Sequence, residues 1–300
     1  MTAATPDFAT LESTLDTLRL RVESALRRLA EDAARSPRIG GAIEHSLFAP
    51  AKRLRPILTL LVADVLRGDG DSVLPAACAV EMIHTASLIL DDLPMMDDAR
   101  MRRGRPTCHV VHGEATAILA AFALMNRAFG VLGEGWPGGP DAALRAQIAQ
   151  DLARAVGLDG MIAGQESDLA MTGRALDFAT LEFIHSRKTG ALFTAAADLG
   201  ALATRAPAAE RTAVVAYAKN LGLAFQIVDD VIDAAGQAAE AGKDVGRDRH
   251  KTTFVTFAGV EGAHQLAREL VETSQRALVA FGPRAQPLRD LAQYVLHRKK

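Results

Sequence analysis

The feature that most constrains this sequence is a pair of acidic clusters, each placed at the end of an apolar, helix-like run. The first is DDLPMMDD at residues 91–98, with four carboxylates within eight residues, and the second is DDVID at residues 229–233. Carboxylates packed this closely repel one another and need a counter-charge. Mg²⁺ is the natural one, because it binds through a few carboxylates together with substrate phosphates. The two clusters therefore predict one cavity with a metal cluster between facing helices.

The composition is typical of a large, soluble, helical protein. Its 300 residues exceed the usual single-domain size, but one large helical bundle can hold them around a single core. Hydrophobic residues make up 49% and charged residues 23%, while only 5% are aromatic and alanine is plentiful, which favours helix over strand. We therefore expect an all-α fold and one domain over residues 1–300, with a ragged N-terminus at residues 1–7.

The net charge and the cysteine content limit the binding partners and the cellular compartment that we expect for this protein. A net charge of −2 gives no overall attraction to nucleic acid or to an anionic membrane, so anions must be bound by local basic clusters. Two cysteines and no recognisable secretory signal indicate a cytoplasmic protein without a disulfide framework. The most apolar runs, residues 76–90 and 115–124, are too short for a membrane span or are interrupted by Glu81 and His84. We expect neither a nucleic-acid-binding nor an integral membrane protein.

Two short basic segments are candidates for anion binding. PAKRLRP at residues 50–56 places three cations between two prolines, which a helix interior would not tolerate, so a basic loop is predicted before a helix over residues 57–66. MRRGRP at residues 101–106 supplies three more cations in an irregular loop. The first segment is either a solvated charge run or a diphosphate clamp, since arginine offers a fork of donors and lysine a point charge.

A long helix is predicted over residues 72–93. Glu81, His84, Leu88 and Asp91 recur on it at intervals of three, four and three. His84 and Asp91 are two turns apart on nearly the same face. A lone histidine on an apolar helix can be a satisfied core residue. The position of His84 on the stripe that leads to the acid cluster favours a histidine that faces the same cavity.

Asp91 and Asp97 would not share a face in a continuous helix, because Asp97 is the sixth residue after Asp91, a rotation of about 600°. Pro94 disfavours helix at Leu93. The sequence therefore predicts that residues 95–98 turn back and bring Asp97 toward Asp91.

Apolar periodicity predicts the remaining helices. They cover residues 8–34, a short segment ending at 48, and residues 113–133, 141–155, 159–169, 176–202 and 210–233, followed by a loop at 236–246 and C-terminal helices. Glycine in Lys188-Thr189-Gly190 lowers helix stability by ~1 kcal/mol relative to alanine, so a kink is expected there, although Lys188 could also be a surface lysine. Spacings of three, four and seven put Gln226 on the face of all three carboxylates of the second cluster.

In this order, these stretches resemble the short-chain trans-polyprenyl diphosphate synthases, the family of farnesyl and geranylgeranyl diphosphate synthases. The first aspartate-rich motif appears as DDLPMMD followed by RRGRPT, and the second as FQIVDDVID. The lysine-threonine pair is Lys188-Thr189, and the lysine loop is GKDVGRDRHKT from residue 242. The upstream GGKRLRP motif is PAKRLRP here, with Pro50-Ala51 in place of two glycines. The resemblance covers about residues 45–260, and five motifs in order are highly specific.

The resemblance implies a bundle of roughly a dozen helices around a deep central cavity, a homodimer, and Mg²⁺ as cofactor, three ions with substrate bound. The implied metal ligands are Asp91, Asp97 and Asp229, with Asp92, Asp230 and Asp233 near them. The implied allylic diphosphate site comprises Arg102, Lys188, Thr189, Gln226 and Lys243. The implied isopentenyl diphosphate site comprises Lys52, Arg55, His84 and Arg103. The residues that carry catalysis would be Asp91, Asp92, Asp97, Lys188, Asp229 and Asp230.

The implied reaction is a head-to-tail (1'-4) condensation of isopentenyl diphosphate with dimethylallyl, geranyl or farnesyl diphosphate. Leu88 and Ile89 suit the apolar wall that shields a carbocation from water. In the resembling family the residue five before the first aspartate helps to set product length, and here it is Ala86, which is small. We therefore expect geranylgeranyl diphosphate (C20). The alternatives are that Ala86 only allows close helix packing and that the product is farnesyl diphosphate (C15).

Two other functions fit parts of the pattern. A class I terpene cyclase, or a head-to-head synthase, would share the helical fold but would not need Lys52 and Arg55 for a second diphosphate, nor the FQIVDDVID motif. A non-catalytic prenyl-synthase-like subunit should have lost some of the motif aspartates. Every acidic motif position is filled in this sequence. The condensing enzyme is therefore the favoured reading.

Overall fold

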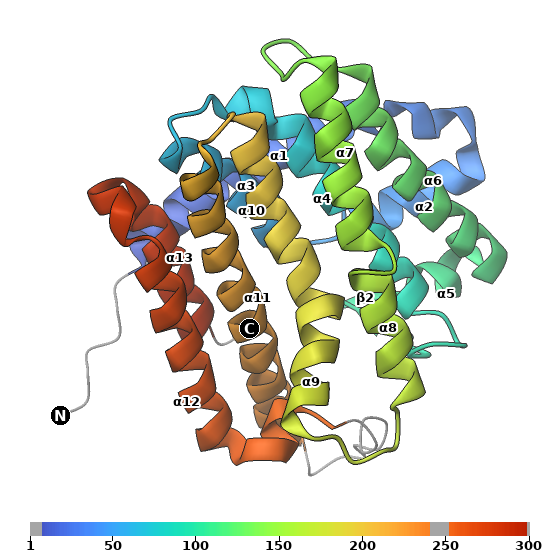
Figure 1. The fold of residues 1–300 in the computed structure, drawn as a ribbon. Coiled ribbons are helices and arrows are strands. Elements are labelled where there is room, and N and C mark those ends of the chain that lie inside the picture. The colour runs from blue at the N-terminus through green and yellow to red at the C-terminus, as the bar shows by residue number, and fades with distance from the viewer. Residues whose placement is uncertain (1–7, 241–251, 299–300) are drawn as a thin grey trace. The chain divides into compact units, whose positions relative to one another are not determined.

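A computed structural model describes residues 8–240 and 252–298, and nearly all of this part of the chain is helical (Figure 1). The helices are α1 (Ala9–Leu29), α2 (Pro37–Leu47), α3 (Leu54–Val65), α4 (Gly70–Asp91), α5 (Cys108–His112), α6 (Glu114–Glu134), α7 (Ala142–Val156), α8 (Met161–Ala170), α9 (Phe178–His185), α10 (Ala191–Ala203), α11 (Ala208–Glu240), α12 (Phe254–Ala277) and α13 (Gln286–His297). Shorter helical turns are η1 (Glu31–Arg35), η2 (Ser186–Gly190) and η3 (Val279–Ala285). The all-α prediction is confirmed.

The predicted irregular loop at residues 101–106 contains a small hairpin instead. Strand β1 (Met101–Arg102) pairs antiparallel with β2 (Arg105–Pro106), with Met101 opposite Pro106. Gly104 and Arg103 both have positive φ, 73° and 53°, which lets the chain reverse within two residues. Strands of two residues leave no alternating pattern in a sequence, so periodicity could not reveal them.

The chain divides into two compact units, which we describe separately. The N-terminal unit comprises Thr14–Leu152 with Leu199–Ala206, and the C-terminal unit comprises the described parts of Met1–Ser13, Ala153–Asp198 and Pro207–Lys300. The first acid cluster and both basic segments lie in the N-terminal unit. The second acid cluster and Lys188 lie in the C-terminal unit.

The core of the N-terminal unit is formed by α3 and α4, which are apolar on nearly all sides and therefore buried. α3 begins at Leu54, three residues earlier than predicted, and Pro56 is its third residue. Proline is tolerated there because the N–H groups of a first helical turn have no partner within the helix.

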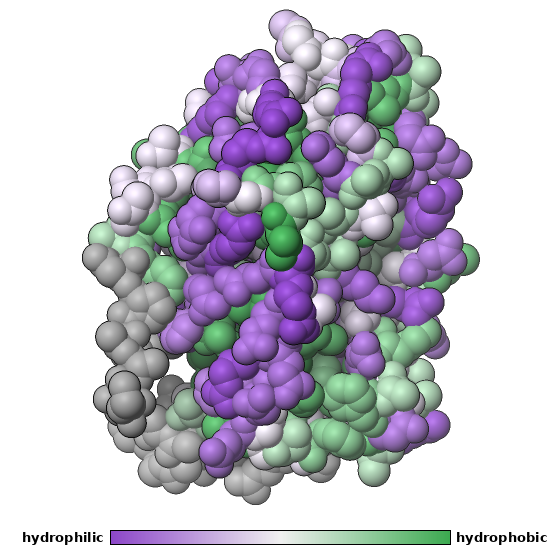
Figure 2. All heavy atoms as spheres, turned by 60° about the vertical axis from the view of Figure 1, so that its left-hand side comes forward, coloured by the Kyte–Doolittle hydropathy of each residue, from purple (hydrophilic) through white to green (hydrophobic). Residues whose placement is uncertain are grey.

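By length and composition, α4 and α6 could each span a membrane, contrary to the sequence-based expectation. The most apolar window of α4 is 72% buried inside the protein, as in the core helix of a soluble protein. Figure 2 shows a face on which hydrophilic side chains surround smaller hydrophobic patches. Scattered exposed apolar side chains of this kind are normal on protein surfaces.

In the C-terminal unit, α11 packs along α12 (Figure 1). The buried cluster at this contact also includes Leu181 of α9 and comprises Leu181, Leu223, Ile227, Val228, Val231, Phe254, Ala263 and Ala267. The apolar positions of α11 in this cluster recur at helical spacing, which leaves the polar residues of the second acid cluster on the rest of the helix surface. Gly236 does not start a loop as predicted, because α11 continues to Glu240.

Candidate active site

The first acid cluster lies at the C-terminal end of α4. Asp91 is the last residue of that helix and Asp92 caps it. After Pro94 the chain turns back as predicted, and the Asp97 N–H donates to the Asp91 carbonyl oxygen at 2.9 Å. Asp91 is partly buried and Asp97 is exposed. The turn thus brings two motif aspartates together where solvent can reach them.

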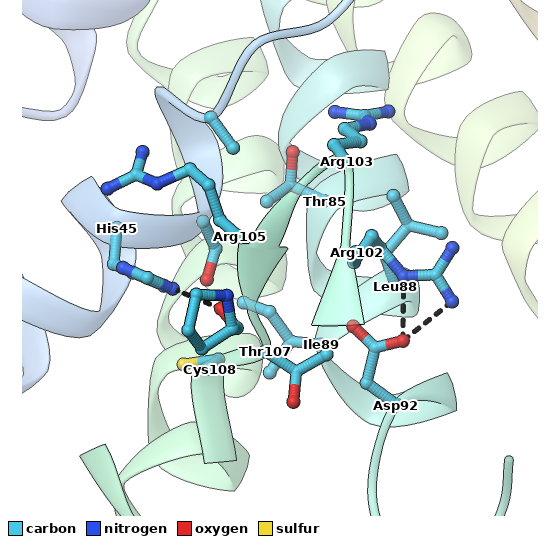
Figure 3. A pocket seen from close by; sticks show the side chains of 13 residues that line it. His45, Thr85, Leu88, Ile89, Asp92, Arg102, Arg103, Arg105, Thr107 and Cys108 are labelled. Atoms are coloured by element: carbon cyan, nitrogen blue, oxygen red, sulfur yellow. Dashed lines mark hydrogen bonds and ion pairs between the residues drawn. The ribbon is translucent and has the colours of Figure 1, made fainter. Parts of the chain in front are cut away.

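The hairpin supplies a counter-charge to Asp92 (Figure 3). Arg102 of β1 donates from Nε to Asp92 Oδ1 at 2.7 Å, and its Nη2 lies 2.6 Å from the same oxygen. Asp92 is 4% exposed, and this burial raises the pKa of its carboxyl group while the hydrogen bond from Arg102 opposes the rise. Asp92 therefore has an arginine partner within the protein.

Beside this pair, a basic cluster surrounds His84. Arg55 Nη1 lies 3.3 Å from His84 Nε2, so that nitrogen accepts a hydrogen bond when the ring is neutral. Burial lowers the pKa of His84 well below its usual value, and the charges of Arg55, Arg103 and Arg102 lower it further. His84 is therefore a neutral acceptor that orients Arg55. Lys52, two residues before α3, is exposed.

Leu88 and Ile89 line a cavity of about 40 Å³ beside Arg102 and Arg103 (Figure 3). A void of that size holds water rather than a substrate. The apolar side of α4 and the cations of the hairpin nevertheless face the same small space. Ala86, two residues before Leu88 on α4, is fully buried.

The neutral state of His84 predicts a pH-dependent stability. Below about pH 6.5 the unfolded chain protonates this residue while the folded protein resists protonation, so the unfolded state binds more protons and stability falls as pH drops. His84→Gln keeps an acceptor for Arg55 but cannot titrate. Chemical denaturation at pH 5.5–7.5 should show wild type losing more free energy of unfolding than the variant on acidification. If the difference in free energy of unfolding between wild type and His84→Gln stays constant over this pH range, the prediction is wrong.

The second acid cluster is organised by a chain of hydrogen bonds in the C-terminal unit. Thr189 Oγ1 donates to Gln226 Oε1 at 2.7 Å, and Gln226 Nε2 donates to Asp230 Oδ1 at 2.9 Å. The backbone N–H of Phe254 donates to Asp230 Oδ2 at 2.9 Å. Burial raises the pKa of Asp230 to about 6, and these two donors oppose that rise. The predicted shared face of Gln226 and the aspartates is confirmed for Asp230.

Lys188 lies in the predicted kink, which is a single π-helical turn, η2. Its Nζ lies 2.6 Å from Asp168 Oδ2 on α8. α8 approaches the turn closely at Gly164, where a Cβ atom would lie 2.3 Å from the Lys188 backbone nitrogen. A side chain at residue 164 would displace this turn. Asp168 was not among the predicted site residues.

Asp229 also has an arginine partner that the sequence did not predict. Arg298 Nη2 lies 2.7 Å from Asp229 Oδ1 and donates to the Phe225 carbonyl oxygen at 2.9 Å. Its guanidinium lies 3.8 Å from the centre of the Phe225 ring, a cation–π arrangement. Asp233, one turn beyond Asp229, lies on the same helix. Lys243, the predicted site residue of the lysine loop, lies outside the described residues.

The family profile for polyprenyl synthetase matches residues 36–278, which include every motif described above. The chain belongs to the polyprenyl synthetase family.

This polyprenyl synthetase is similar to several enzymes of known product. It is 41% identical over 260 residues to a geranylgeranyl diphosphate synthase of Cyanophora paradoxa, and the aligned residues make up 86% of each chain. It is 40% identical over 270 residues to a farnesyl diphosphate synthase of Geobacillus stearothermophilus, covering 89% of this chain and 91% of that one. Among solved structures, a geranyltransferase from Legionella pneumophila superposes with a TM-score of 0.87 at 32% identity and 97% coverage of both chains.

The donor set of this polyprenyl synthetase fits magnesium. Within residues 8–240 and 252–298, no three carboxylate, histidine or cysteine groups are already gathered as a metal site. Mg²⁺ does not require that, because it keeps several waters and binds through one or two carboxylates together with phosphates. Asp91 is partly buried and Asp97 is exposed, and both offer hard oxygen ligands. Asp92 and Asp229 have arginine partners.

Proposed function

We propose that this protein catalyses the magnesium-dependent, head-to-tail condensation of isopentenyl diphosphate with allylic diphosphates, with geranylgeranyl diphosphate as main product. The observation that carries the proposal is the end of α4, where the chain turns Asp97 back to Asp91 beside the basic cluster around His84. Paired acidic and basic groups of this kind suit two diphosphates, one bound through metal and one bound by cations. Family membership and the similarity to geranylgeranyl diphosphate synthases support the same reaction.

In the proposed reaction the allylic C–O bond breaks, leaving an allylic cation and pyrophosphate. The double bond of isopentenyl diphosphate attacks the cation, a C–C bond forms, and the departing pyrophosphate takes the proton that is lost. Magnesium, held by Asp91, Asp97 and Asp229 with Asp92, Asp230 and Asp233 near, would neutralise the charge on the leaving group. We propose three ions per site and a cavity where the two acid motifs face each other.

The residues of this chain then have separate tasks. The allylic diphosphate would be bound by Arg102, Lys188, Thr189, Gln226 and Lys243. The diphosphate group of isopentenyl diphosphate would be bound by Lys52, Arg55, His84 and Arg103. Neutral His84 accepts from Arg55 and so keeps that guanidinium in place as a charge-assisted donor. Gln226 links Thr189 to Asp230, which couples the π turn to the second acid cluster.

The proposal is tested by incubating purified protein with isopentenyl diphosphate and each allylic starter across a magnesium titration. We expect no condensation without magnesium and C20 as the main product with it. The similarity to a farnesyl diphosphate synthase favours C15 as the second candidate, and product length decides between them. Cyclic or head-to-head products, or a protein inactive at every magnesium concentration, would contradict the proposal.

We further propose a single domain over residues 1–300 that acts in the cytoplasm as a homodimer. Leu119 and Phe122 on α6 support a subunit interface, because these large side chains are 52% and 54% exposed. They lie three residues apart, on neighbouring positions of the helix surface.

The assignment of the basic cluster predicts a selective loss of affinity. Arg55→Ala and Lys52→Ala should raise KM for isopentenyl diphosphate far more than KM for the allylic partner. A lost charge-assisted phosphate contact costs on the order of 1.5–3 kcal/mol, which corresponds to about 10- to 100-fold. Steady-state kinetics with each substrate varied in turn measures this. Arg67→Ala, at an exposed arginine just beyond α3, is the control. Equal effects on both KM values would show that the two diphosphate sites are assigned the wrong way round.

A further inference from the structure

Arg53 is the middle cation of the KRLR segment, yet it is not a surface charge. Its side chain is 0% exposed and that of Glu81 on α4 is 2% exposed. Arg53 Nη1 donates to Glu81 Oε1 at 2.7 Å. Nη2 donates to the carbonyl oxygens of Leu47 and Ala49, the latter at 3.4 Å. The guanidinium therefore connects the end of α2 and the loop after it to the middle of α4.

The backbone of Arg53 is as unusual as its side chain. Arg53 precedes the first residue of α3 and adopts φ 54° and ψ 35°, the left-handed region. This conformation is energetically unfavourable for a residue with a Cβ atom, and contacts with the surroundings can offset its cost. The contacts to Glu81, Leu47 and Ala49 are such contacts. The left-handed turn is therefore maintained by the buried side chain of the same residue.

This turn separates the two cations that the proposed function assigns to isopentenyl diphosphate. Lys52, just before the turn, is exposed. Arg55, two residues after it, is the second residue of α3 and contacts His84. Arg53 is directed into the core, whereas Lys52 is exposed and Arg55 is partly buried. A relaxed turn would redirect Lys52 and shift the start of the helix that carries Arg55.

We infer that Arg53 is a positioning residue, whose fork to Glu81, Leu47 and Ala49 fixes the turn that presents Lys52 and Arg55 to the diphosphate of isopentenyl diphosphate. The inference rests on the proposed function, because it specifies how two of its binding residues are placed. Arg53 itself touches no substrate.

Two replacements separate positioning from charge neutralisation. Arg53→Lys keeps a cation beside Glu81 but loses the planar fork that reaches both carbonyl oxygens. The double variant Arg53→Met/Glu81→Leu removes both fully buried charges and leaves Glu23, which lies 3.7 Å from Arg53 and is 27% exposed, to Arg19, so that it serves if the lysine variant folds poorly. Arg67→Lys is the matched control, because Arg67 also has a positive φ, 62°, lies at the other end of α3, and is exposed.

The experiment measures isopentenyl diphosphate binding by calorimetry together with KM for each substrate, kcat and Tm. For both Arg53 variants we expect binding weaker by on the order of tenfold to 10²-fold, the range that a displaced binding group produces. KM for the allylic substrate and kcat at saturation should stay near wild type, and Arg67→Lys should match wild type throughout.

Normal affinity in either folded Arg53 variant would overturn the inference, because neutralising Glu81 would then be the whole role of Arg53. Equal losses for both substrates would also overturn it, because they would indicate general disruption. Wild-type protein that fails to bind isopentenyl diphosphate would instead overturn the proposed function, and the inference with it. The wild-type measurement thus tells the two failures apart.

Discussion

Replacing Asp91 or Asp229 with alanine is expected to lower turnover by orders of magnitude while leaving the helical fold intact. Both residues are predicted magnesium ligands, one at the end of α4 and one on α11. The leaving pyrophosphate develops negative charge as the C–O bond breaks. Removing one group that stabilises such charge typically costs about 10²- to 10³-fold in kcat. Each variant should therefore fall at least that far.

The partner of Asp229 requires a second variant. Asp229→Ala leaves the guanidinium of Arg298, whose side chain is 5% exposed, without its carboxylate, which could lower stability for reasons unrelated to metal. Asp229→Asn keeps a hydrogen-bond acceptor for Arg298 but removes the negative charge. We expect it to be nearly as inactive as Asp229→Ala.

Single-turnover and steady-state rates at saturating Mg²⁺ measure the effect, and circular dichroism with Tm checks the fold. Asp64→Ala, at an exposed aspartate near the end of α3, is the control and should turn over normally. Near-normal turnover in either Asp91→Ala or Asp229→Ala would show that the two motifs do not serve one metal site.

Ala86→Phe is expected to shift the main product from C20 to C15. Ala86 lies five residues before Asp91 on α4, about 7.5 Å along the helix from the acid cluster. A prenyl tail that descends from a diphosphate bound at the cluster would pass this depth. A phenyl ring there would close the space below a fifteen-carbon chain. Product analysis by chain length measures the change.

Overpacking is the competing explanation, because Ala86 is fully buried and a larger side chain can strain a packed core. Ala77→Phe is the matched control: Ala77 is equally buried, but nine residues of helix place it on the opposite face of α4. It should lower Tm without shortening the product. A wild-type enzyme that already stops at C15, or an Ala86→Phe variant with unchanged products, would contradict the chain-length assignment.

The sequence predicts most of this fold because its local signals are strong. Apolar periodicity locates the long helices, Pro94 predicts the turn that joins Asp97 to Asp91, and Gly190 marks the break after α9. Two predicted helix boundaries were wrong, because the rules for proline and glycine in helices have exceptions. Pro56 lies in a first helical turn, where it is tolerated, and Gly236 does not end α11.

The partners of the site residues could not be predicted, because they depend on contacts between distant segments. Lys188 binds Asp168, twenty residues earlier, and Asp229 binds Arg298, sixty-nine residues later. No sequence rule says which of three neighbouring cations points inward, so Arg53 was grouped with Lys52 and Arg55. That the two acid motifs face each other, and that three metal ions bind, both stay predictions.

The π turn at Ser186–Gly190 sets the phase of the helical run that contains it. A π turn holds one residue more than an α-helical turn, so the segments before and after it are offset by about 100°. Leu181 and Ile184 are buried before the turn, and Thr189 is buried within it, five residues beyond Ile184 rather than four. In an uninterrupted helix the fourth position, that of Lys188, would continue the buried stripe. The extra residue moves that stripe on by one position and lets Lys188 keep its charge beside Asp168. A buried residue, Thr189, and a partly buried cation, Lys188, can therefore occupy adjacent positions without ending the helix.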